Sequence, residues 1–133
     1  MLSKTREWDL RCPRALMNMF PVRRGYYYKV DRKQARKIVR ILARAYGVPV
    51  PTVCDTAPDK GYNGTYWYNG ERIQVHARCH MKSVFHEFYH HLENKTNGKY
   101  DSNDRRGGAS SYAWQFADHL FDLLRVQLML DGK

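Results

Sequence analysis

The chain contains one short run whose residue types and spacing are typical of a metal site, the H-E-x-x-H pattern at residues 86–90. On an α-helix, residues i and i+4 lie about 40° apart around the axis, so the imidazoles of His86 and His90 would project side by side and could share one metal ion. Glu87 would lie at the flank of that ion, where a carboxylate serves as general base toward a metal-bound water. The spacing therefore predicts a metal site with hydrolytic chemistry.

A helical wheel predicts a two-sided helix for this motif. One side holds the apolar residues Met81, Val84, Phe85, Phe88 and Leu92. His86, His90 and Glu93 lie almost opposite, so the two histidines are expected to face water or a cleft, and a cleft needs a second wall. A plain polar helix surface is the alternative, which the specificity of the motif disfavours. Glu93 lies about 10 Å along the axis from His86, too far for a shared ligand, and suits a supporting position behind the metal ligands.

Three segments before the motif give clear signals of regular structure. Asp31 is a good N-cap for an amphipathic helix over residues 32–46, and Gly47 supplies its stop. Residues 48–53, which include two prolines, are typical of an extended segment at the edge of a sheet. The aromatic and β-branched residues on either side of Asn69-Gly70 predict a hairpin over residues 65–76, closed by a type I′ turn.

The motif helix itself is expected over about residues 81–93, with Asn97-Gly98 as its stop. After a polar loop, Ser110 or Ser111 would begin a long helix that runs to about Leu130. The predicted buried face of that helix comprises Ala113, Phe116, Ala117, Leu120, Phe121 and Leu124. Weaker patterns indicate a short helix near residues 15–19 and a strand within residues 22–30.

Length and composition bound the class of protein. The 133 residues, 43% of them hydrophobic, suffice for one domain with its own core. The three cysteines, Cys12, Cys54 and Cys79, lack C-x-x-C spacing, which disfavours a zinc ribbon or a disulfide framework and fits a reducing compartment. The first twenty residues carry six charged side chains without an uninterrupted apolar run, and no stretch reaches membrane-spanning length. We therefore expect a cytoplasmic protein that makes no membrane contact.

All of the net positive charge lies in the first third of the chain. Residues 1–46 hold 13 Lys and Arg against 3 Asp and Glu, whereas residues 47–133 hold 10 of each. The polar face of the predicted 32–46 helix carries six of the cations: Arg32, Lys33, Arg36, Lys37, Arg40 and Arg44. Such a face could neutralise phosphates of a nucleic acid or meet another acidic partner, or it could be only a solvated surface. Residues 1–30 are interpreted as a basic N-terminal extension of the single domain, 1–133.

The predicted elements follow one another as a helix, a small sheet ending in a hairpin, an HExxH helix and a final helix. This order resembles the minimal zincin fold of class α+β. The sequence is similar to the small gluzincins, also called minigluzincins, and to the ImmA/IrrE-like peptidases, over roughly residues 31–130 with the specific part at 73–121. This resemblance implies zinc as the cofactor, His86 and His90 as two ligands and Glu87 as the general base. It also implies that the strand at residues 73–76 lines the cleft, where a peptide would add as a further strand.

The third zinc ligand of that family is the Glu of an E-x-x-A-x-x-F-A pattern on the final helix. The apolar positions of the pattern are present here, but Ser110 stands at the ligand position, and a hydroxyl is a poor zinc ligand. The remaining donors are Asp101 and Asp104 in the preceding loop, and Asp104 is our first candidate for the third ligand. Asp118 and His119 have suitable chemistry but fall on the polar side of the wheel. The alternatives are a site of two histidines with waters, or one that has lost tight zinc binding.

These observations predict a zinc-dependent metallopeptidase that hydrolyses peptide bonds through a metal-activated water. The alternative from a different class is a non-catalytic DNA-binding or regulatory protein on a zincin-like scaffold, for which Ser110 and the basic first third are the reasons. A structural module stabilised by a metal is a third hypothesis.

Several residues near the motif are interpreted as structural. His76, Cys79 and His80 match no zinc pattern, so we expect a strand end and a helix start there. His91 would point about 100° away from its neighbour His90, which indicates a hydrogen-bonding or exposed residue rather than a ligand.

Overall fold

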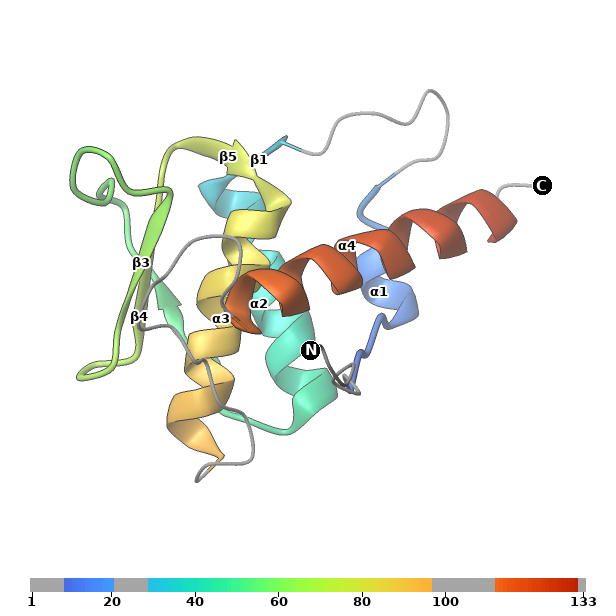
Figure 1. Cartoon of the computed structure of the whole chain (residues 1–133), viewed down its shortest axis with the longest axis horizontal. Coiled ribbons are helices and arrows are strands. Elements are labelled where there is room, and N and C mark those ends of the chain that lie inside the picture. Colours follow the sequence, from blue (N-terminus) through green and yellow to red (C-terminus); the bar gives the residue numbers. More distant parts are fainter. Residues whose placement is uncertain (1–8, 21–28, 97–111, 132–133) are drawn as a thin grey trace, which may run out of the picture.

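A computed structural model describes residues 9–20, 29–96 and 112–131 of the chain (Figure 1). Within these ranges the fold is mixed α+β, as expected, with four helices and two small sheets. The helices are α1 (Arg14–Met17), α2 (Arg32–Tyr46), α3 (Met81–Lys95) and α4 (Tyr112–Asp131). The strands are β1 (Lys29–Asp31), β2 (Thr52–Val53), β3 (Gly64–Trp67), β4 (Arg72–Val75) and β5 (Arg78–His80).

Helix α2 begins and ends where the sequence predicts. The Asp31 carboxylate accepts a hydrogen bond from the backbone N of Gln34 at 2.7 Å, and the Gln34 side chain accepts one from the Asp31 backbone at 3.0 Å, which completes a capping box. At the other end Gly47 has a φ of 71°, a left-handed conformation that glycine adopts at little cost. The apolar side of the helix lies in the core: Ala35, Ile38, Val39, Leu42 and Ala43.

The predicted hairpin is present as β3 and β4, but its turn differs from the prediction. Trp67 lies opposite Arg72, the register that a turn centred on Asn69-Gly70 requires. A type I′ turn would need positive φ angles at Asn69 and Gly70. Positive φ angles occur instead at Gly70 (90°) and Glu71 (53°), so the prediction of a type I′ turn is wrong. Glu71 is held by contacts outside the hairpin, because its carboxylate pairs with Lys95 of α3 at 2.7 Å and its carbonyl accepts from the backbone of β2 at 3.0 Å.

Strand β4 is the centre of a three-stranded sheet, parallel to β2 and antiparallel to β3. On the β2 side, the backbone N of Cys54 donates to the Ile73 carbonyl at 2.8 Å, and Arg32 Nε donates to the Val75 carbonyl at 3.1 Å. Both edges of β4 are therefore occupied, and the expectation that residues 73–76 bind a peptide by strand addition is wrong. Among the described strands, β3 is the edge strand that packs against α3.

The described part of residues 1–30 is built into the domain rather than extending from it. Strand β1 pairs antiparallel with β5 and buries Val30 completely. Helix α1 contributes Leu16 and Met17 to the same core. The interpretation of residues 1–30 as an extension is therefore corrected for these residues, because their apolar side chains pack against the rest of the protein.

Helix α3 lies at the centre of the molecule. It packs against the β3–β4 hairpin, α2 and α4, so ten consecutive residues, 83–92, are all buried (Figure 1). The predicted buried face of α4, Ala113 to Leu124, is confirmed, with each of its six residues at most 7% exposed. None of the helices in the described ranges is long and apolar enough to cross a membrane.

Candidate metal centre

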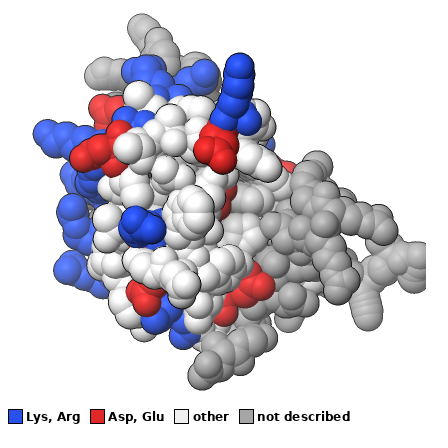
Figure 2. All heavy atoms as spheres, turned by 90° about the vertical axis from the view of Figure 1, so that its left-hand side faces the viewer, with Lys and Arg blue, Asp and Glu red and all other residues white. Residues whose placement is uncertain are grey.

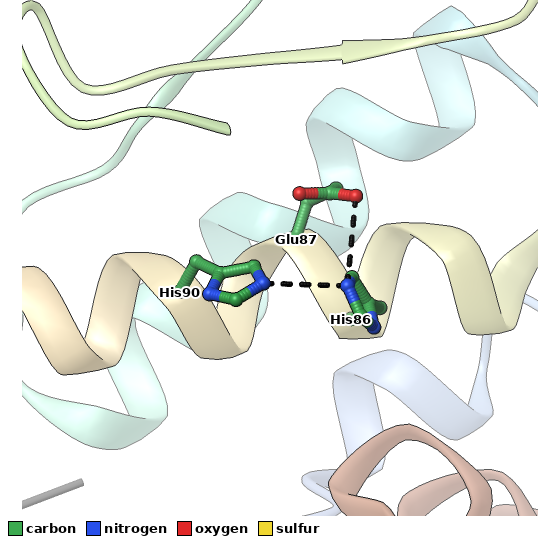
Figure 3. Close-up of side chains that lie close together, drawn as sticks. All are labelled: His86, Glu87 and His90. Atoms are coloured by element: carbon green, nitrogen blue, oxygen red, sulfur yellow. Dashed lines mark hydrogen bonds and ion pairs between the residues drawn. The ribbon is translucent and has the colours of Figure 1, made fainter. Parts of the chain in front are cut away.

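The HExxH motif lies on α3, as predicted, in its first three turns. Strand β5 leads directly into this helix, and the His80 side chain caps it by accepting a hydrogen bond from the backbone N of Lys82 at 3.1 Å. Figure 3 shows His86, Glu87 and His90 close together on one side of α3. Their exposed fractions are only 8%, 5% and 8%, so the motif is not an ordinary polar helix surface.

The two imidazoles have the spacing of two ligands on one metal ion. His86 Nε2 and His90 Nε2 are 3.3 Å apart. Two nitrogens that bind a tetrahedral zinc at 2.0–2.1 Å lie about 3.3–3.4 Å from each other, so this separation fits that geometry. Glu87 Oε2 is 3.9 Å from His86 Nε2. These three side chains form the one group of three possible ligands found within residues 9–20, 29–96 and 112–131.

The surroundings of His86 keep its imidazole neutral. Burial, and to a lesser extent the neighbouring His90, lowers the pKa of His86 to about 3. A neutral imidazole has a lone pair for a metal, whereas a protonated one does not. The ring packs against the indole of Trp114 from α4, with centroids 4.2 Å apart, and its Nδ1 has no hydrogen-bond partner in the described part of the chain. Packing therefore orients this histidine.

His90 is oriented by hydrogen bonds instead. Its Nδ1 lies 3.3 Å from Glu93 Oε1 and 3.2 Å from the Tyr68 hydroxyl, which itself donates to Glu93 at 2.6 Å. Oxygens beside Nδ1 favour a proton on that nitrogen and leave the Nε2 lone pair directed toward His86. Glu93 lies beside His90, at the place predicted for it, and its support of a metal ligand stays a prediction. Tyr68 was not predicted, because the sequence shows only an aromatic residue beside a turn.

The second wall of the site is the edge strand β3. A cleft of about 440 Å³ lies above the motif, a volume within the usual range for ligand sites. It is lined by Asp59, Tyr62, Gly64, Thr65, Tyr66, Trp67, Tyr68, Gln74, His86, Glu87 and His90. No Lys or Arg is among these residues, although the chain carries a net charge of +10. The exposed rings of Tyr62, Trp67 and Tyr68 make much of this wall aromatic.

His91, the neighbour of His90, has a different environment. It is fully buried, with Nδ1 2.7 Å from the Tyr66 hydroxyl and Nε2 2.7 Å from the Pro49 carbonyl. Burial lowers its pKa, so a neutral ring links β3 to the segment before β2. The hydrogen-bonding interpretation of His91 is therefore confirmed, and both of its nitrogens have protein partners.

The other candidates from the sequence fall outside this group. Asp118 pairs with Lys82 at 3.1 Å, and His119 is exposed, so neither joins the motif histidines, as predicted. Cys79 is buried, which raises its thiol pKa to about 11, and it lies in a strand before the helix cap, as the structural interpretation requires. Ser110, Asp104 and Asp101 lie outside the described residues, so the third ligand stays a prediction.

Comparison of the chain with protein-family models, with curated proteins and with solved structures finds no match. The evidence for this site is therefore its own geometry: two imidazoles whose Nε2 atoms have the spacing of zinc ligands, with a carboxylate beside them, next to an edge strand.

Proposed function

We propose that the protein is a zinc-dependent peptidase whose metal is held by His86 and His90. The observation that carries this proposal is the 3.3 Å separation of the two Nε2 atoms, with the Glu87 carboxylate on the same side of α3 and a cleft in front of them. A minimal zincin-like fold is part of the same proposal, which the order of the helices and the hairpin supports. Asp104 stays the first candidate for a third ligand.

In this proposal each side chain has one task. Zinc, when bound, polarises the scissile carbonyl and lowers the pKa of a coordinated water to about 7. Glu87 takes the proton from the attacking water and delivers it to the leaving amine, which suits a carboxylate whose Oε2 lies 3.9 Å from a ligand nitrogen. Glu93 and Tyr68 hold His90 so that Nε2, not Nδ1, is the ligand atom.

The edge of β3 is the proposed place for the substrate backbone. In the described part of the sheet β3 pairs with β4 alone, and four of its residues line the cleft beside the motif. A peptide that adds as a strand to this edge would gain main-chain hydrogen bonds and pass in front of His86 and Glu87. This replaces the predicted role of the strand at residues 73–76.

A first experiment tests the enzyme directly. We expect the purified protein to bind zinc with a stoichiometry near one and to cleave members of a diverse peptide library, measured by mass spectrometry of the products. A chelator should abolish cleavage and added zinc should restore it, since two histidines without the ion supply no electrophile. Stoichiometric zinc without any cleavage would favour the structural module, and no zinc at all would favour the non-catalytic scaffold.

A second function, contact with nucleic acid, is supported by the exposed cations of α2. Lys33, Lys37, Arg40 and Arg44 are exposed and form one stripe of i, i+4 and i+3 steps. Figure 2 shows Lys and Arg gathered along one margin of the face that carries the hairpin. Arg36 does not belong to this stripe, because it donates to the Val53 carbonyl at 3.2 Å and pairs with the Asp55 carboxylate, which follows β2.

Charge reversal tests this second function. Changing Lys37, Arg40 and Arg44 to Glu should weaken duplex DNA binding and lower the slope of log affinity against log salt by about 3, roughly one per lost phosphate contact. The matched control reverses Lys60, Arg72 and Arg78, three exposed cations elsewhere, and makes the same change in net charge. Equal losses of DNA affinity in both triple variants would mean that binding depends on net charge alone, and the stripe would have no special role.

A further inference from the structure

Gly64 in β3 lies unusually close to the proposed general base. A Cβ atom built on Gly64 would be 2.9 Å from Glu87 Oε2 and 3.1 Å from Glu87 Cγ. Real Cβ atoms essentially never approach another heavy atom within 3.0 Å. The backbone of β3 therefore occupies a position beside Glu87 that a residue with a side chain would not allow unless Glu87 moved.

The backbone conformation of Gly64 gives no other reason for a glycine. Gly47, Gly61 and Gly70 all have positive φ angles, which favour glycine whatever surrounds them. Gly64 does not, so an alanine could adopt its backbone conformation, and glycine within a strand is otherwise unfavourable. Close approach of a neighbouring group is the remaining explanation for glycine at this position, and Glu87 is the nearest neighbour.

The same oxygen of Glu87 faces both the strand and the proposed metal ligands. Oε2 is the atom that a Cβ on Gly64 would meet, and it is also the atom that lies 3.9 Å from His86 Nε2 (Figure 3). Glu87 is only 5% exposed, so neighbouring groups enclose most of its side chain, and the cleft is the space that remains open beside it. The strand thus limits one side of the space in which Oε2 can lie.

We propose that Gly64 is a positioning residue: its missing side chain lets β3 lie against the Glu87 carboxylate and confine it beside His86, where the proposed general base is needed. This inference rests on the proposed function for its catalytic meaning, but the contact itself does not. Gly64→Ala should displace Oε2 by a fraction of an ångström or more. Because misplacement by about 1 Å can cost a hundredfold in rate, we expect kcat to fall at least about tenfold, with KM and zinc affinity nearly unchanged.

A Cβ atom on Gly64 would also lie 3.2 Å from the Gln74 carbonyl oxygen. The experiment must therefore distinguish a clash with Glu87 from a clash with this carbonyl. Gly64→Ala is therefore combined with Glu87→Ala and with Glu87→Gln, and the Tm of each metal-free protein is measured. Alanine at 64 should lower Tm when residue 87 is Glu or Gln, since both fill the same space. In the Glu87→Ala background it should leave Tm unchanged or raise it, because the obstructing side chain is gone and alanine restricts the unfolded chain.

Equal Tm losses in all three backgrounds would place the obstacle at the Gln74 carbonyl and overturn the inference, as would an unchanged kcat in Gly64→Ala. Loss of kcat together with the background-dependent Tm supports it. If the unmodified protein cleaves no peptide, the proposed function fails, whereas the Tm cycle on metal-free protein still decides whether Gly64 makes room for Glu87.

Discussion

Glu87→Gln is expected to lower kcat for peptide hydrolysis by about 10²–10⁴-fold, the range that a positioned general base contributes. The amide has the shape of the carboxylate but cannot accept the proton of the attacking water. Because Gln fills the same space against Gly64, the fold should be retained. The proposed ligand atoms, His86 Nε2 and His90 Nε2, are untouched, so zinc should bind as it does to the unmodified protein.

The matched control is Glu93→Gln, which removes a carboxylate from the same helix. Glu93 contacts the Tyr68 hydroxyl and Nδ1 of His90, the ring nitrogen that faces away from His86, so we expect its loss to weaken zinc binding by about 10–100-fold and to spare kcat at saturating zinc. Kinetics at saturating zinc, together with zinc stoichiometry and Tm, distinguish the two variants. Similar kcat values for Glu87→Gln and the unmodified protein would contradict the role of Glu87 as the general base.

Features with local signals were predictable from the sequence. The helix at α2 follows from Asp31, Gln34 and Gly47, because a capping box and a left-handed stop act within a few residues. The side of α3 that carries His86 and His90 follows from the helical period alone. The hairpin register was predictable for the same reason, although the conformation of its turn was not, since Glu71 is also held by Lys95.

Features set by distant pairing were not predictable. Strand β2 pairs in parallel with β4, and no local sequence pattern predicts this pairing. Because β2 covers the free side of β4, the edge strand beside the motif is β3. The same limit applies to the cations of α2. Arg32 and Arg36 belong by period to the basic stripe, yet they donate to carbonyls of β4 and β2. Periodicity identifies the face of a helix, but only the assembled sheet supplies the partners of that face.

Alanine substitutions of the adjacent residues His90 and His91 should change different properties. His90→Ala should weaken zinc binding, whereas His91→Ala should lower the stability of the fold. Free energies of zinc binding of about 10–16 kcal/mol in four-ligand structural sites average roughly 3 kcal/mol per ligand. We therefore expect His90→Ala to weaken zinc binding by about a hundredfold or more, measured by competition with a chelator. The Tm of the metal-free protein should change little, because His90 faces the cleft and its partners Glu93 and Tyr68 bond to each other.

His91→Ala should instead lower stability by about 2–4 kcal/mol and leave zinc affinity within a few fold. It creates a cavity beside β3 and removes the imidazole that meets the Pro49 carbonyl, whereas the Tyr66 hydroxyl still accepts from Asn94 at 3.0 Å. The measurements are denaturant unfolding of the metal-free proteins and the same chelator competition. Loss of zinc in His91→Ala with affinity retained in His90→Ala would show that the helix presents the other histidine to the metal, and the proposed site would be wrong.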